Sequence, residues 1–176
     1  MLLFKKIILM TYVILVVTVV TAQNNSDKKG VVINGVKWAT RNVGMPGFFV
    51  ASPEHYGRSY TWNEARKVCP TGWRLPTKIE IESLVATGGE RTTINDVIGS
   101  VFGSDNDTIF LPAGGDFRYN NTEEPLGFYW CSNKSMNRGY NYLLFTVFND
   151  DFEVQTGFFY CSKRQRMQYS VRCVAE

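Results

Sequence analysis

Histidine and closely spaced cysteines are both scarce in this sequence of 176 residues. His55 is the only histidine, and the closest two of the four cysteines, Cys161 and Cys173, lie twelve positions apart. A structural zinc site draws its ligands from short Cys and His spacings, and a serine or cysteine nucleophile needs a nearby base. The sequence therefore predicts no metal, no cofactor and no catalytic residue, and we expect a protein that is not an enzyme.

An excess of charge of one sign is also lacking. The chain has 19 Lys and Arg against 16 Asp and Glu, a net charge of +3, and without Lys5 and Lys6 the balance is 17 against 16. Such a balance predicts no nucleic-acid partner. A hydrophobic content of 44% with 14% aromatic residues excludes disordered, collagen-like and coiled-coil chains, and it predicts a compact globular domain.

The one long apolar run lies at the N-terminus, from Ile7 to Val20, after two lysines and before the small residues Thr21 and Ala22. It is shorter than the roughly 20 residues that span a bilayer. The pattern predicts a signal peptide over 1–22, a flexible tether over 23–30 and one domain over 31–176. We expect a secreted protein with no stable membrane span after cleavage; an uncleaved anchor is the alternative.

Four cysteines in an exported chain predict two disulfides, because the number is even and the compartment is oxidising. They are Cys69, Cys131, Cys161 and Cys173. Three pairings are possible on this reasoning alone.

Local signals predict a hairpin and two helices in the first half of the chain. Asn34-Gly35 separates two short apolar runs and favours a two-residue type I′ turn. Thr61 with Glu64, and Thr77 with Glu80, have the spacing of a capping box, which starts a helix. The first helix is expected to run for about two turns.

A third helix is predicted from apolar residues at helical spacing, Ile94, Val97, Ile98 and Val101, with Thr93 as its cap. From Thr108 onward the chain changes to short apolar and aromatic runs separated by Gly, Asn and Asp, which are typical of strands. Early helices followed by late antiparallel strands predict the α+β class. The aromatic residues of this late sheet, Trp130 among them, are expected in the core.

Several pieces of the chain occur in one order that is similar to a bacterial domain family. These pieces are Val36 to Gly44, Tyr60 to Ala65, Cys69 to Thr77, Phe110 to Gly115, Gly127 to Trp130 and Ser170 to Val174. From Val31 to Val174 the chain resembles the FISUMP family, the Fibrobacter succinogenes major paralogous domain. The resemblance implies a single C-type lectin-like domain, related to the formylglycine-generating-enzyme fold, in the periplasm or on the outer surface of a Gram-negative bacterium. It implies no general activity.

The chain departs from the family pattern at two cysteines. Cys131 follows Trp130 where such domains usually read Tyr-Trp-Ser-Ser, and Cys161 is a further addition. Because both are gained together, the comparison implies a Cys131–Cys161 disulfide, which leaves Cys69 to pair with Cys173. Arg74 and Arg172, which lie inside family-like pieces, are expected to fix loops by donating to backbone carbonyls.

Polar and aromatic residues mix in turn-rich sequence at Arg118, Tyr119, Tyr140 and Asn141. Aromatic rings pack against the C–H faces of a sugar, while amide and guanidinium groups bond its hydroxyls. We predict that these four residues contact a ligand and that the protein is an extracytoplasmic, non-catalytic binding module for a carbohydrate. A structural or adhesive surface component that contacts protein is the alternative, and an enzyme of unknown type comes third.

Overall fold

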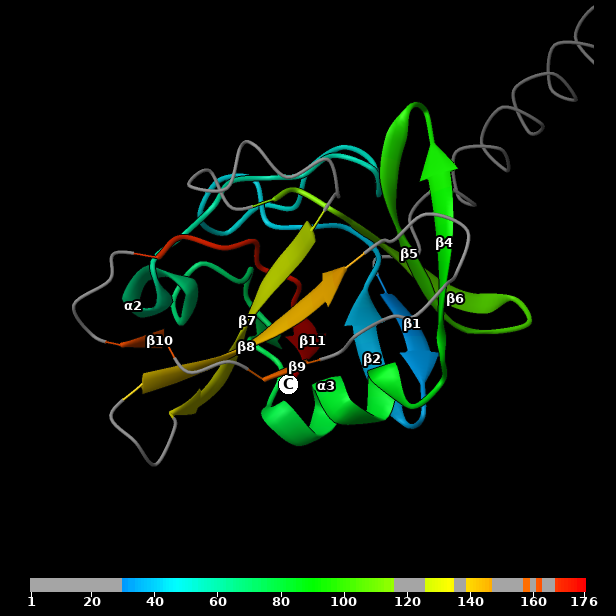
Figure 1. The fold of residues 1–176 in the computed structure, drawn as a ribbon. Coiled ribbons are helices and arrows are strands. Elements are labelled where there is room, and N and C mark those ends of the chain that lie inside the picture. The colour runs from blue at the N-terminus through cyan, green and yellow to red at the C-terminus, as the bar shows by residue number, and fades with distance from the viewer. Residues whose placement is uncertain (1–29, 116–125, 135–138, 147–156, 159–160, 163–166) are drawn as a thin grey trace, which may run out of the picture.

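Three antiparallel sheets and two short helices make up the part of the chain that the structure describes (Figure 1). The structure is a computed structural model that describes residues 30–115, 126–134, 139–146, 157–158, 161–162 and 167–176. One sheet has the order β1-β2-β11-β3, with bounds Gly30–Ile33, Val36–Ala39, Val174–Ala175 and Trp73–Arg74. The second has the order β4-β5-β6, with bounds Gly89–Ile94, Val97–Ser104 and Asp107–Pro112. The third has the order β10-β8-β7, with β9 also paired to β8, and its bounds are Cys161–Ser162, Gly139–Thr146, Leu126–Lys134 and Gly157–Phe158. The helices are α2, Trp62–Ala65, and α3, Lys78–Val85.

The first hairpin forms where the sequence predicts it. Asn34 and Gly35 both have positive φ, 48° and 77°, and Ile33 pairs with Val36 across the turn. Two positive φ values in sequence define the type I′ turn that suits the twist of a hairpin. Strand β11, the last of the chain, then pairs with β2, so the C-terminal end of the chain lies beside this first hairpin.

Both predicted capping boxes are confirmed. The Glu64 carboxylate accepts from the Thr61 N–H at 2.8 Å, and Glu80 accepts from the Thr77 N–H at 2.6 Å. Helix α2 is one turn long rather than two. The Lys67 N–H donates to the Glu64 carbonyl at 2.8 Å, an i to i−3 bond that tightens the last turn and ends the helix.

The third predicted helix is wrong, because its residues form the β4–β5 hairpin. Asn95 and Asp96 adopt φ of 47° and 64°, a second two-residue turn in the middle of the expected helix. The spacing of Ile94, Val97, Ile98 and Val101 fits a helix, but all four are β-branched and favour strands. Pairing of β5 with β6 on its other side decides between the two structures.

The expected separation of early helices from late strands is confirmed only in part. Both helices lie in the first half, but β3 lies between them and the β4–β5 hairpin follows α3 in place of the third helix. The coarser prediction of mixed helix and mostly antiparallel strand content in a disulfide-linked chain is confirmed.

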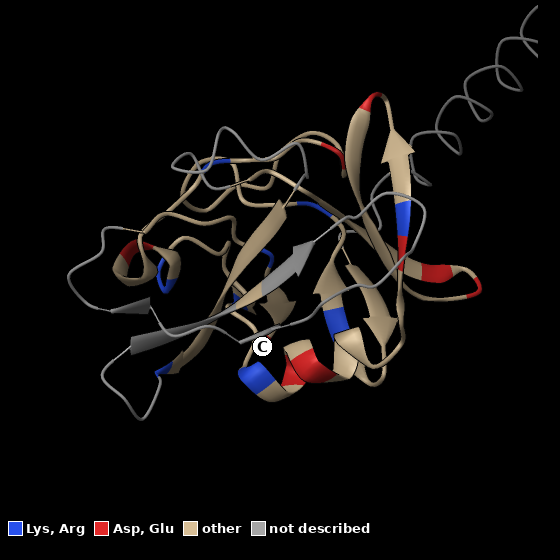
Figure 2. Cartoon of the chain, in the orientation of Figure 1, with Lys and Arg blue, Asp and Glu red and all other residues tan. Residues whose placement is uncertain are grey.

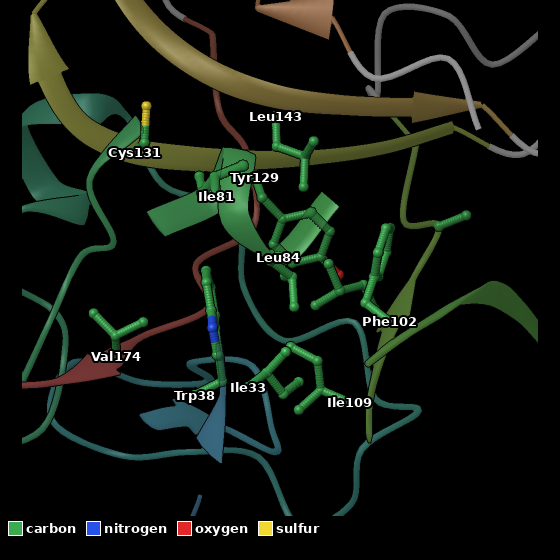
Figure 3. Close-up of a cluster of buried hydrophobic side chains, with 12 residues drawn as sticks. Ile33, Trp38, Ile81, Leu84, Phe102, Ile109, Tyr129, Cys131, Leu143 and Val174 are labelled. Atoms are coloured by element: carbon green, nitrogen blue, oxygen red, sulfur yellow. The ribbon is translucent and has the colours of Figure 1, made fainter. Parts of the chain in front are cut away.

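The main core lies where α3 packs against strands from all three sheets (Figure 3). Its buried side chains are Ile33, Trp38, Ile81, Leu84, Phe102, Ile109, Leu111, Ala113, Tyr129, Cys131, Leu143 and Val174. A second buried cluster surrounds α2 and contains Trp130, which is 1% exposed as predicted. Its indole N–H donates to the Tyr60 carbonyl at 2.6 Å, so the buried polar atom of this large side chain is satisfied.

Candidate functional site

The four residues predicted to contact a ligand fall in two places. Arg118 and Tyr119 lie outside the residues that the structure describes. Tyr140 and Asn141 lie in strand β8 rather than in a loop, and Tyr140 pairs with Lys134 on one side and Cys161 on the other. The structure describes only the backbone of Tyr140 and Asn141, so their role in binding stays a prediction.

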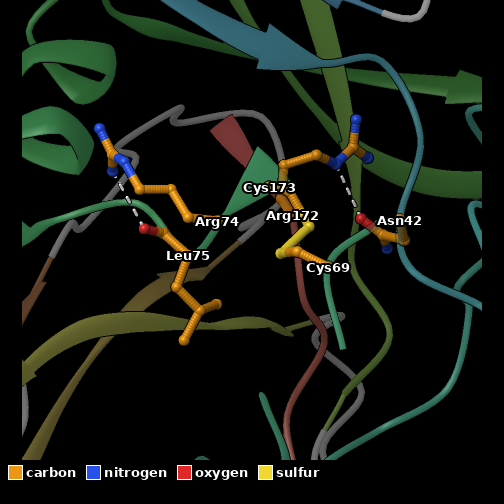
Figure 4. Close-up of a disulfide and its surroundings, with 6 residues drawn as sticks. All are labelled: Asn42, Cys69, Arg74, Leu75, Arg172 and Cys173. Carbon is orange, nitrogen blue, oxygen red and sulfur yellow. Dashed lines mark hydrogen bonds between the residues drawn. A yellow bond between two sulfur atoms is a disulfide. The ribbon is translucent and has the colours of Figure 1, made fainter. Parts of the chain in front are cut away.

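The predicted disulfide between Cys69 and Cys173 is confirmed (Figure 4). It joins residues 104 positions apart, with a Cα–Cα distance of 6.1 Å. Cys173 is fully buried, and the bond connects the segment after α2 to the last residues before β11. The disulfide therefore ties the loop that starts at Pro70 to the C-terminal end of the chain.

The predicted Cys131–Cys161 disulfide is not formed, because Cys131 is a free, buried thiol. Cys131 lies in β7 and Cys161 in β10, and strand β8 runs between them. Neighbouring strands are about 4.8 Å apart, so two strands separated by a third are about 9.6 Å apart, beyond the roughly 7 Å that a disulfide can bridge. Burial raises the pKa of the Cys131 thiol to about 12.

Arg172 is a buried guanidinium that joins three separate segments, and Figure 4 shows its bond to Asn42. It donates to the carbonyls of Ala39 at 3.0 Å and Phe110 at 2.9 Å, and to Oδ1 of Asn42 at 2.9 Å. Ala39 and Asn42 lie on either side of Thr40-Arg41, so these bonds fix the backbone that carries Arg41. The expected structural role of Arg172 is confirmed.

Asn42 and Tyr129 extend this buried cluster. The Asn42 amide donates to the Tyr56 carbonyl at 2.9 Å and to the Tyr129 hydroxyl at 3.2 Å, and Tyr129 in turn donates to the Pro112 carbonyl at 2.8 Å. Burial lowers the pKa of Arg172 to about 10 and raises the pKa of Tyr129 to about 12. At neutral pH the guanidinium is therefore charged and the phenol is neutral.

Arg74 also donates to a backbone carbonyl, that of Leu75 at 3.2 Å (Figure 4). Its main partner is Glu80, which it contacts through two nitrogens at 2.6 and 2.9 Å. The hydrogen bonds from Arg74 lower the pKa of Glu80 to about 2. The pair joins β3, which begins at Trp73, to the first turn of α3.

Two tight turns lie close to the Cys69–Cys173 disulfide. In Met45–Phe48 the Phe48 N–H donates to the Met45 carbonyl at 2.9 Å, and in Pro70–Trp73 the Trp73 N–H donates to the Pro70 carbonyl at 3.0 Å. Gly47 and Gly72 occupy the third positions with φ of 83° and 79°. Both are therefore type II turns, in which the third residue needs the positive φ that glycine adopts without strain.

The two turns are connected and together form a pocket. The Gly47 N–H donates to the Val68 carbonyl at 2.9 Å, which connects the first turn to the chain just before the second. Between the turns lies an open pocket of about 370 Å³, within the size range of small-molecule sites. Its lining residues are Arg41, Gly47, Phe48, Phe49, Pro70, Thr71 and Trp73.

Contacts on several sides fix the orientation of the Trp73 ring in this pocket. Phe49 meets it edge-on, with ring centroids 5.4 Å apart and planes at 90°. A Cβ added to Gly30 would lie 2.7 Å from the tip of the indole, so only glycine leaves room for the ring on that side. Lys37 Nζ lies 6.0 Å from the centroid of the same ring. These contacts hold the indole in one orientation.

Phe48 and Arg41 complete the lining with contrasting chemistry. Phe48 is 65% exposed, an unusual exposure for a large apolar side chain on a rigid turn. Arg41 is half-buried and donates from Nη1 to the Ala51 carbonyl at 3.1 Å. Among the described residues, the pocket thus combines flat apolar surfaces with a guanidinium and the hydroxyl of Thr71.

Sequence reasoning missed this pocket. The signal was present, because Met45-Pro46-Gly47-Phe48 and Pro70-Thr71-Gly72-Trp73 both place glycine third and an aromatic residue fourth. Each pattern predicts a type II turn that ends in an aromatic residue. That the two turns face one another depends on contacts between distant segments, which no local pattern reveals.

Acidic residues lie at both turns of the β4-β5-β6 sheet and on helices α2 and α3 (Figure 2). Among the described residues, no group of three His, Cys, Asp or Glu side chains is placed to hold a metal ion. Neither of the two described helices is long and apolar enough to cross a bilayer.

No protein-family model, curated protein or solved structure matches this chain. The resemblance to the FISUMP family and the C-type lectin-like fold that it implies therefore stay predictions.

Proposed function

We propose that this protein is a non-catalytic, extracytoplasmic binding module of C-type lectin-like fold that holds a carbohydrate in the pocket between its two type II turns. The observation that carries the proposal is the placement of Phe48, Phe49 and Trp73 around a cavity of about 370 Å³, with the Trp73 ring held by Phe49. Rigid aromatic surfaces bind with little loss of conformational entropy, since the receptor is already ordered.

The chemistry of the lining suits a sugar ring. The apolar faces of Trp73 and Phe48 can cover C–H groups, while the Arg41 guanidinium and the Thr71 hydroxyl can bond ring hydroxyls. Phe48 and Thr71 are exposed, so the site is open and shallow. We expect weak binding, with Kd on the order of 10 μM to 1 mM, strengthened where several copies bind one polymer.

The disulfide supports the location. A disulfide such as that between Cys69 and the buried Cys173 forms and persists in oxidising compartments, as expected for a chain exported by an N-terminal signal peptide. The four residues predicted from sequence, Arg118, Tyr119, Tyr140 and Asn141, remain a second possible location of the ligand, and they are tested with the pocket.

A glycan array with the protein exported by cells that express the full chain tests the proposal. Phe48→Ala should weaken binding to any retained glycan about tenfold, because it removes most of one apolar wall of the pocket. Ile79→Ala is the matched control, since Ile79 is an exposed apolar residue on α3, 75% exposed. Binding that survives Phe48→Ala but is lost in Tyr119→Ala or Tyr140→Ala would place the site in the other segment.

A second function, adhesion to a surface protein, is favoured by one observation. Met45 and Phe48 are each 65% exposed on the same turn, and exposed apolar residues of this kind often mark protein contacts. If the array retains no glycan, and Met45→Ala and Phe48→Ala both weaken adhesion to a protein surface, the adhesive function replaces the carbohydrate function.

A further inference from the structure

We propose that the turn Met45–Phe48 is an apolar tip that enters the headgroup region of an anionic lipid bilayer, so that the exported domain binds a membrane surface without spanning it. The lipid contact adds a second partner to the carbohydrate of the proposed function. Met45 is not among the residues that line the carbohydrate pocket, so the two contacts can be tested separately.

All four residues of this turn are exposed, and none has a polar side chain. They are Met45, Pro46, Gly47 and Phe48, and Met45 and Phe48 are each 65% exposed. The hydrogen bond from the Phe48 N–H to the Met45 carbonyl closes the turn, which brings the Cα atoms of these two residues within about 7 Å of each other. Apolar side chains gathered in this way can enter a lipid surface together.

The backbone of the turn is prepared for an apolar environment. Pro46 has no N–H, the Gly47 N–H donates to the Val68 carbonyl at 2.9 Å, and the Phe48 N–H is used within the turn. The Phe48 carbonyl accepts from the Gly44 N–H at 2.9 Å. An unpaired backbone N–H is costly in the apolar part of a bilayer, so this pairing lowers the cost of insertion.

The same features favour a lipid surface over a protein partner. A stable protein interface buries about 800 Å² on each side and has about one hydrogen bond per 100–200 Å². The turn offers two large apolar side chains and no polar one, and the N–H groups of Gly47 and Phe48 are already paired. A bilayer needs no hydrogen bonds from the tip and adapts to a small protrusion.

Lys67 places one cation beside the tip. It is exposed and directly precedes Val68, whose carbonyl accepts from the Gly47 N–H. The Lys67 backbone therefore lies next to the turn, and its long side chain can reach a lipid phosphate while the apolar side chains enter the surface. One such cation near an anionic membrane strengthens binding about fivefold.

Arg58 places a second cation on the segment that precedes the tip. Its N–H donates to the Val43 carbonyl at 3.1 Å, and its guanidinium lies 6.0 Å from the Tyr60 ring. The Tyr60 hydroxyl in turn donates to the Gly44 carbonyl at 2.6 Å. Glu64 lies close enough for its charge to interact with that of Arg58, so this one carboxylate offsets part of the positive charge of the two cations.

Flotation of the exported protein with lipid vesicles tests the inference. One set of vesicles is pure phosphatidylcholine, and the other contains about 30% phosphatidylglycerol, which adds negative charge. Binding should be at least about tenfold stronger to the anionic vesicles at about 50 mM NaCl, and the preference should shrink at about 500 mM. This comparison needs no variant, so it holds whether or not a substituted protein folds.

An apolar variant locates the contact. Met45→Ser should weaken binding to anionic vesicles about tenfold, because it removes an apolar group that enters the bilayer, and it should leave the affinity for any retained glycan unchanged. Ile79→Ser is the matched control, since Ile79 is 75% exposed on α3. Helix α3 lies at the opposite end of the molecule from the segment between β2 and α2 (Figure 1), so this change should not affect vesicle binding.

Charge variants test the two cations. Arg58→Gln and Lys67→Gln should each weaken binding to anionic vesicles about fivefold and leave binding to phosphatidylcholine unchanged. Lys134→Gln is the control for Arg58→Gln, because Lys134 also lies over an aromatic ring, 5.9 Å from the Trp62 centroid. It should change neither affinity.

A fluorescent variant distinguishes insertion from adsorption by charge alone. Lipids with brominated acyl chains quench tryptophan that enters the bilayer. Quenching should be stronger for Met45→Trp than for Ile79→Trp, and both variants keep the four native tryptophans, so the difference reports the position of the new ring.

The outcomes separate this inference from the functions proposed above. Equal binding to both kinds of vesicle at low salt, unchanged binding by Met45→Ser, or equal quenching of the two tryptophan variants would each overturn it. If no vesicle is bound and Met45→Ser weakens adhesion to a protein surface, the adhesive function replaces it. Glycan retention is measured on a separate array, so a failure with vesicles leaves the carbohydrate function standing.

Discussion

Replacing Arg172 with methionine should destabilise the fold by about 3 kcal/mol. The change leaves three buried acceptors without a donor, the carbonyls of Ala39 and Phe110 and Oδ1 of Asn42. Each such acceptor costs about 1 to 3 kcal/mol. The variant also no longer has to desolvate a charged guanidinium on folding, and this offsets several kcal/mol of the lost free energy of unfolding. The long apolar methionine fills most of the space, so the cavity term stays small.

Urea unfolding at neutral pH, followed by tryptophan fluorescence, measures the free energy of unfolding. Arg172→Lys should cost at least as much as Arg172→Met. Lysine keeps the cost of a buried charge, but its ammonium satisfies fewer of the three acceptors than the guanidinium does. Arg58→Met is the control: Arg58 is exposed and lies 6.0 Å from the Tyr60 ring, so its loss should cost less than about 1 kcal/mol. A cost below 1 kcal/mol for Arg172→Met would refute the reasoning.

Two further predictions concern stability. Cys69→Ala with Cys173→Ala should lower the free energy of unfolding by about 4.7 kcal/mol, the chain-entropy value for a loop of about 100 residues, and a loss below 1 kcal/mol in urea unfolding would contradict this. Glu80→Gln should cost about 2 kcal/mol at neutral pH, after allowance for solvent at the partly exposed Arg74. Because the folded pKa of Glu80 is lowered from 4.5 to about 2, the native protein should lose this stability as pH falls from about 4.5 towards 2, while the variant should show a flatter acid limb in the same assay.

Features that depend on neighbouring residues were predictable from the sequence. The Asn34-Gly35 hairpin and the two capping boxes each follow from backbone preferences and hydrogen bonds within four residues. The β4–β5 hairpin was missed for a physical reason: β-branched residues at helical spacing satisfy two patterns, and only pairing with β6 decides between them. Asn95-Asp96, which can adopt positive φ, was a further local signal against the helix.

The candidate site was less predictable because it is built from distant segments. The sequence indicated that Arg172 donates to carbonyls, but not which ones, and Phe110 lies 62 positions away. The pairing inferred for Cys131 failed because simultaneous gain of two cysteines does not report the distance between strands. Strand order places β8 between them, and strand order is a property of the whole fold.

The segment from Val171 to Cys173 connects the stability of the fold to the binding pocket. The Val43 N–H donates to the Val171 carbonyl and the Ala39 N–H to the Cys173 carbonyl, so this segment holds the chain on both sides of Arg41. Through its disulfide, Cys173 also holds the start of the second turn. Both walls of the pocket thus depend on one stretch of three residues. Variants there should weaken ligand binding in proportion to the fraction of molecules in which the segment has detached, since a ligand binds only the assembled pocket.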